Sequence, residues 1–199
     1  MSNYILMVVQ FILIVVLAPI VWAASLAFYK HLEFYPALYR DAFLSGLVTF
    51  LFSFLFFNRF EAMFRLGQDL MGKVFKFIAP FDRIITSIIS LYVLVLMIVF
   101  FCVTTFLGAH QFDAYFMFFI GFLSLMHVLL LAQGLQDEEK SFIKLSCLLT
   151  MCFVVIFDIF LILLFLDLIS ADFTFLDFLG SLCHEAADIY KMIFSRVMG

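Results

Sequence analysis

The chain has 199 residues, of which 67% are hydrophobic and only 13% are charged, and its mean hydropathy is +1.22. A water-soluble domain of this length is close to one-half apolar, so the composition excludes an ordinary soluble fold and predicts an all-α, polytopic integral membrane protein. The formal net charge of −4 gives no electrostatic support for a nucleic-acid partner.

Two long apolar runs, at residues 4–29 and 39–57, open the chain. As helices, both approach or exceed the length that crosses about 30 Å of hydrocarbon, so both are predicted to be transmembrane. The second run carries small residues at helical spacing, which predicts a seam where another helix approaches closely; the alternative is that this face lines a polar path. The seam consists of Ser45, Gly46, Thr49 and Ser53.

Residues 59–79 alternate apolar and polar side chains at helical spacing, which predicts an amphipathic helix. Its polar side carries the cations Arg65, Lys73 and Lys76. Such a helix either lies in the headgroup layer or presents its charged face to a partner protein, and we keep both interpretations.

Three further apolar runs, at 84–107, 113–132 and 142–169, complete about five predicted spans. Gly108 marks a tight turn between the first two, and the polar residues 136–140 are expected to form a loop outside the hydrocarbon. Because there is neither an internal repeat nor a long polar linker, residues 1–199 are predicted to form a single membrane domain.

A second amphipathic helix is predicted at residues 172–197, with too many charges to span the bilayer. Asp177, His184 and Asp188 lie on its polar face and are candidates for docking. The segment from His184 to Asp188 reads HExxD, whereas the zinc-binding pattern is HExxH and needs a third ligand. We therefore predict a polar helix face here and no metal.

Asp158 lies near the centre of the fifth predicted span, where an ionised carboxylate costs several kcal/mol. The favoured interpretation is a carboxyl group that hydrogen-bonds across a helix interface; the alternative is a proton or cation site. His127, about 9 Å inside the fourth span, is expected to bond to a nearby backbone or hydroxyl group, or alternatively to form a relay with Asp158.

The distribution of cations predicts the orientation. With five spans, one side of the membrane holds seven Lys and Arg residues and the other holds four, so the N-terminus is predicted to be cytoplasmic and the C-terminus outside. Lys30, which follows the first span, argues the reverse, and a re-entrant or sixth spanning tail would change the count. The membrane is expected to be a bacterial inner membrane or an organelle membrane.

The four cysteines show neither a CxxC pair nor a zinc-site spacing, and most of them are expected to be small buried hydrophobes, with a Cys102–Cys183 disulfide as the alternative. Phosphate-binding loops, nucleophile elbows and haem-ligand pairs are also missing from the sequence. We therefore predict that the chain has no cofactor and is not an enzyme.

These features predict a non-catalytic membrane subunit that serves as a scaffold, assembly or docking element of a larger complex. Its expected partners are the lipid bilayer and either other membrane proteins or further copies of itself. The alternative is a small oligomeric transporter or channel in which Asp158 handles a cation or proton. A membrane enzyme that modifies lipids is a third hypothesis, but it would need a catalytic cluster that the sequence does not reveal.

Overall fold

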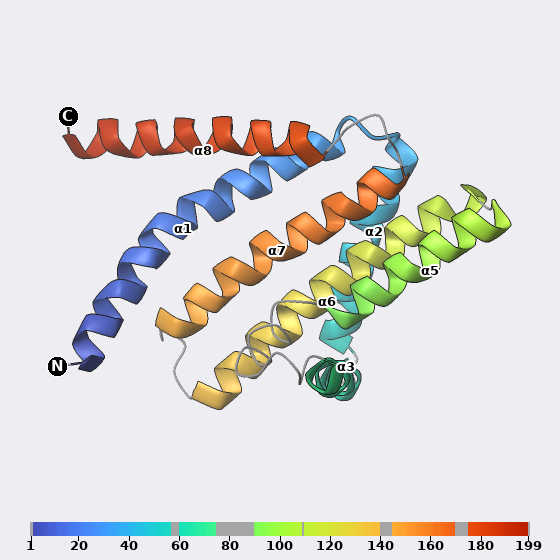
Figure 1. Cartoon of the computed structure of the whole chain (residues 1–199), viewed down its shortest axis with the longest axis horizontal. Coiled ribbons are helices and arrows are strands. Elements are labelled where there is room, and N and C mark those ends of the chain that lie inside the picture. The colour runs from blue at the N-terminus through green and yellow to red at the C-terminus, as the bar shows by residue number, and fades with distance from the viewer. Residues whose placement is uncertain are drawn as a thin grey trace. The chain divides into compact units, whose positions relative to one another are not determined.

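The computed structural model describes residues 2–56, 60–74, 90–108, 110–139, 145–169 and 175–198, and its described elements are all helices (Figure 1). The prediction of an all-α chain is confirmed. In chain order the elements are α1 (Ser2–Leu32), α2 (Ala37–Phe56), α3 (Phe60–Val74), α5 (Leu91–Leu107), the 3-10 helix η2 (His110–Phe112), α6 (Asp113–Glu139), α7 (Leu145–Ile169) and α8 (Phe175–Met198).

Within these described ranges, four helical stretches are long and apolar enough to cross a membrane. They match four of the predicted spans and cover Met7–Leu32, Ala37–Phe56, His110–Leu135 and Leu145–Ile169. α5 is apolar but has 17 residues, fewer than the roughly 20 that a bilayer requires. Residues 84–89 of the predicted third span lie outside the described residues, so a fifth crossing stays a prediction.

The end of α6 differs from the prediction. The polar residues 136–139, expected in a loop, continue the helix as far as Glu139. Gln136, Glu138 and Glu139 are of types with high helix propensity, and a polar helix end can leave the hydrocarbon without losing its backbone hydrogen bonds. The predicted turn at Gly108 is present, because this residue ends α5 with φ of 58°, in the left-handed region that suits glycine.

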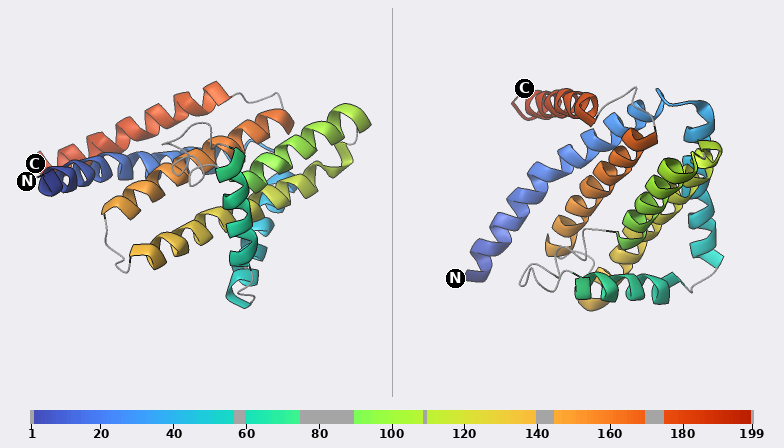
Figure 2. Two further views of the ribbon diagram at one scale, coloured as in Figure 1. Left: turned by 60° about the horizontal axis from the view of Figure 1, so that its bottom comes forward. Right: turned by 45° about the vertical axis from the view of Figure 1, so that its right-hand side comes forward.

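The chain divides into two compact units, each described here by itself. The first contains Met1–Phe34 and Glu139–Gly199, with helices α1, α7 and α8; the second contains Tyr35–Glu138, with α2, α3, α5 and α6. The prediction of one membrane domain is not tested by this division. In the first unit α1 and α7 lie side by side in all views, and α8 packs on α1 (Figure 2).

In the second unit, α2 and α6 cross where two glycines meet. A Cβ on Gly46 would overlap the carbonyl oxygen of Phe118, and a Cβ on Gly121 would overlap that of Phe43. Only a residue without a side chain allows the two backbones to approach this closely. One turn after Gly46 on α2, the ring of Phe50 packs edge-on to two other rings. Its centroid lies 5.1 Å from that of Phe122 and 5.4 Å from that of Phe60.

Candidate functional site

The C-terminal helix α8 is attached to its unit by an apolar stripe. Phe178 is fully buried and Leu182 is buried one turn later, as expected for side chains four residues apart on one helix face. The ring of Phe178 lies 6.0 Å from that of His31 on α1 and 6.3 Å from that of Phe160 on α7. Both neighbouring helices therefore hold the first half of α8 in place.

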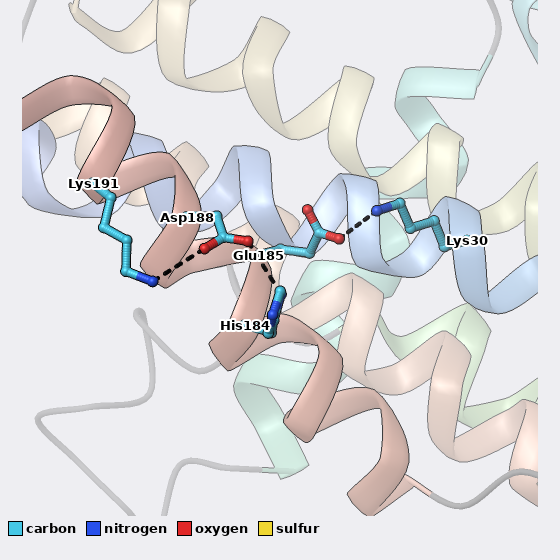
Figure 3. A network of polar contacts seen from close by, with 5 residues as sticks. All are labelled: Lys30, His184, Glu185, Asp188 and Lys191. Atoms are coloured by element: carbon cyan, nitrogen blue, oxygen red, sulfur yellow. Dashed lines mark hydrogen bonds and ion pairs between the residues drawn. The ribbon is translucent and has the colours of Figure 1, made fainter. Parts of the chain in front are cut away.

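Polar side chains on α8 make two separate sets of contacts, one with α1 and one within α8 itself (Figure 3). Lys30 of α1 donates a hydrogen bond to Glu185. Asp188 lies between two partners: its carboxylate is 3.3 Å from Nδ1 of His184 and 3.3 Å from Nζ of Lys191. His184 and Lys191 are each 78% exposed, so this group faces outward from the unit.

Tyr190 ties α8 to the middle of α1. Its hydroxyl donates a hydrogen bond of 2.5 Å to the backbone carbonyl of Val16. Pro19 lies inside α1 and has no backbone N–H, so the helical hydrogen bond to the carbonyl of Val15 is lost. A hydroxyl from a neighbouring helix commonly supports the backbone next to such a break. The tail helix therefore braces α1 one residue away from the carbonyl that loses its helical donor.

A hollow of about 390 Å³ lies between α1 and α8, lined in part by Lys30, His31, Ser181 and His184. Its size is at the lower end of small-molecule pockets. However, Lys30 is bonded to Glu185, and His184 lies against Asp188, so these polar groups of the lining already have partners. This arrangement does not favour a small ionic ligand.

The two predicted intramembrane residues are both buried. Asp158 lies on α7 and is 4% exposed, and His127 lies on α6 and is 2% exposed. The ring of His127 lies 6.1 Å from that of Phe64 on α3, within the same unit. Because Asp158 and His127 belong to different units, the proposed relay between them stays a prediction.

The first amphipathic helix, α3, also has one packed face and one charged face. Phe64, Gly67 and Met71 are buried against their unit. Arg65 and Lys73 are exposed, and Arg65 bonds to Glu61 one turn before it. The third predicted cation, Lys76, lies outside the described residues. A hollow of about 330 Å³ beside this helix is lined in part by Arg65, Gln68 and Gln133.

Only one residue of the predicted seam on α2 lies at the contact with α6. Gly46 is buried at the crossing with α6, whereas Ser45 and Thr49 are exposed and Ser53 is half-buried. The face that packs is marked by Phe43, Gly46 and Phe50, at intervals of three and four residues. The hydroxyl of Ser45 donates to the carbonyl of Ala42 on its own helix instead of reaching another helix.

Several residues that make these contacts were not predicted from the sequence. Gly121 stands alone in an apolar run, and nothing in the run indicates which helix it meets. Tyr190 and Glu185 contact partners more than 150 residues away in the chain. In the second unit, buried Asp113 accepts a hydrogen bond of 3.4 Å from Tyr39, and its position in the first turn of α6 was the available signal.

The cysteines do not behave as predicted. None of the four is buried: Cys102 and Cys183 are exposed, Cys147 and Cys152 are half-buried, and all are free thiols. Cys102, Cys147 and Cys152 lie on the apolar helices α5 and α7, where a weakly polar side chain needs no burial if the surroundings are lipid, and Cys183 lies on the amphipathic helix α8. Among the residues that the structure describes, no group of three or more His, Cys, Asp or Glu is placed to hold a metal ion.

Comparison with known proteins finds no matching family model, no similar curated protein and no similar solved structure. In the residues that the structure describes, the fold defines an all-helical protein with four apolar helices of membrane-crossing length and two amphipathic helices.

Proposed function

We propose that this chain is a non-catalytic integral membrane subunit that joins a larger complex through its amphipathic helices α3 and α8. The observation that carries the proposal is the division of each helix into a packed face and an exposed charged face. On α8 the packed face is Phe178 and Leu182, and the charged face contains His184, Asp188 and Lys191.

Fold stability alone does not account for these charges. Exposed ion pairs contribute about 0–1 kcal/mol each, and many contribute nothing measurable. Charged groups on an exposed face contribute more to the choice and orientation of a binding partner than to the stability of their own fold. The four apolar stretches supply the membrane anchor that such a subunit needs, and the cation distribution supports a cytoplasmic N-terminus.

The test is purification of the full chain from its native membrane in mild detergent. The proposal expects other membrane proteins in fixed stoichiometry with the wild-type chain. It also expects them to be lost from the triple variant His184→Ala, Asp188→Ala and Lys191→Ala. A matched control is Leu176→Ala, which changes another exposed side chain of α8 and should retain the partners. Equal recovery with both variants would exclude α8 as the docking element.

A second candidate is a small oligomeric channel or transporter, and the burial of Asp158 favours it. A carboxyl group inside a long apolar helix is costly and is commonly functional. In this case the purified chain, alone in liposomes, should conduct or take up a cation or protons, and Asp158→Asn should abolish that activity. If Asp158→Leu leaves both assembly and transport intact, neither role of this carboxyl group survives.

A further inference from the structure

The contacts of α8 show how far it extends along α1. Phe178 meets His31, Glu185 meets Lys30, and Tyr190 meets Val16, so the two helices run in opposite directions. From His31 back to Val16, α1 rises by about 22 Å at 1.5 Å per residue. Val16 lies near the middle of the apolar stretch Met7–Leu32. If α1 crosses the bilayer, the hydroxyl of Tyr190 is therefore close to the bilayer centre, and α8 enters the hydrocarbon beside α1.

An exposed polar stripe follows α8 through this region. Its members are separated by intervals of four and three residues, so they form one nearly straight line along the helix. All of them are exposed in the described unit. This polar stripe consists of Asp177, Ser181, His184, Asp188, Lys191 and Ser195.

Acyl chains are unsuitable neighbours for this polar stripe. Lipid tails cannot donate or accept hydrogen bonds, and charged side chains within the hydrocarbon usually pair with each other or face protein. Asp188 is half exposed and Lys191 is 78% exposed, although they pair with each other. Their pairing leaves most of Lys191 exposed, so a protein surface that covers the pair would stabilise α8 at this depth.

A second copy of the chain fits this role poorly. Two copies with the same orientation in a membrane are related by an axis along the membrane normal, so two inserted α8 helices would pair in parallel. Asp188 would then face the same carboxylate of the other copy, and Lys191 the same ammonium group. Such like-charge contacts are unfavourable.

We propose that α8 is inserted in the membrane and that its polar stripe binds a transmembrane helix of a different protein; this inference rests on the proposed function. The polar stripe contains two carboxylates and one lysine, so the matching helix carries hydroxyl, amide or basic side chains opposite Asp177 and Asp188 and no carboxylate there. The insertion also brings Arg196 toward the N-terminal end of α1, the side that is predicted to hold most of the cations.

The test uses a photo-crosslinking amino acid in the full chain, in native membranes. It is placed at Ser195, on the polar stripe, or at Phe194, which has the same depth but lies on another exposed face. The inference expects cross-links from position 195 to a transmembrane segment of a different protein. Their yield should exceed that from position 194 by about tenfold and fall by a similar factor in Asp188→Lys, because opposed charges set the pairing.

Other outcomes overturn the inference. Cross-links from position 195 to a second copy exclude the different protein as occupant, and cross-links to lipid alone exclude protein cover. Fast reaction of a Ser195→Cys variant with a membrane-impermeant maleimide excludes insertion. If stoichiometric partners are purified but cross-link only from other positions, this inference fails while the proposed function stands; if no partner is purified, the proposed function itself fails.

Discussion

The two units of this chain differ in the contacts that hold their helices together. In the unit with α2 and α6, the helices meet through Gly46 and Gly121, and backbone lies directly on backbone. In the unit with α1 and α8, the contacts combine the buried ring of Phe178 with side-chain hydrogen bonds, from Lys30 to Glu185 and from Tyr190 to Val16. Glycine contacts tolerate no added atom, whereas side-chain contacts can open and close. The α2–α6 contact therefore depends on the absence of two side chains, whereas the α1–α8 contact depends on the presence of specific ones.

The largest effect should come from adding a methyl group at the glycine crossing of α2 and α6. In Gly46→Ala or Gly121→Ala the new methyl group would overlap a backbone carbonyl, so α2 and α6 must separate, at a cost of about 1–3 kcal/mol or more. The free energy of unfolding in detergent, from SDS or thermal denaturation, measures this loss.

Gly134→Ala and Gly180→Ala are the matched controls, because nothing lies within 4 Å of a Cβ at either position. Alanine has higher helix propensity than glycine, by up to about 1 kcal/mol, so these variants should be as stable as the parent or more stable. A comparable loss at all four positions would show that the crossing has no special role.

A smaller effect is expected from Tyr190→Phe, which removes only the hydroxyl that bonds to Val16. The loss of one hydrogen bond should cost about 1 kcal/mol, and α8 should detach more often from α1. Limited proteolysis within α8 reports that detachment. Tyr29→Phe, at an exposed position of α1, should leave the cleavage rate unchanged. Identical rates in all three proteins would argue against the brace.

The Lys30–Glu185 pair should contribute less, because Lys30 is 59% exposed and solvent screens its charge. A double-mutant cycle with Lys30→Ala and Glu185→Ala should give a coupling energy of up to about 1 kcal/mol. The exchanged variant, Lys30→Glu with Glu185→Lys, should regain part of it. A coupling energy of zero would mean that the pair does not hold α8.

The smallest effect is expected at the exposed pair of Glu61 and Arg65 on α3. Pairs of this kind, one helical turn apart, contribute about 0.3–0.5 kcal/mol. Arg65→Ala should therefore hardly change the unfolding free energy, while it removes a cation from the exposed face of α3. A loss above about 1 kcal/mol would place Arg65 in the core packing of its unit instead.

Sequence patterns predicted the local features of this chain well. The apolar stretches and the amphipathic character of α3 and α8 follow from residues close together in the sequence, so periodicity detects them. Pairing between distant helices leaves no such periodicity. Gly46 was noted for its small neighbours, yet Ser45 and Thr49 point outward, because the face that packs is set by where α6 lies.

The same limit applies to the site. His184 and Asp188 were expected on one face of a helix, and their spacing is sufficient to bring them together. Lys30 and Val16 are far away in the sequence, and no residue type or spacing links them to α8. The sequence predicted a tail helix too charged to span. The inference that this helix enters the membrane comes from these distant contacts and not from a local pattern.

The mass of the intact particle extracted from native membranes tests the central claim most directly. If this chain is a docking subunit, the wild-type chain should be found in a defined complex heavier than its own 23.0 kDa and containing other membrane proteins. The triple alanine variant at His184, Asp188 and Lys191 should be released from that complex as a folded chain. A particle that contains only this chain, with the same mass in wild type and variant, would contradict the claim.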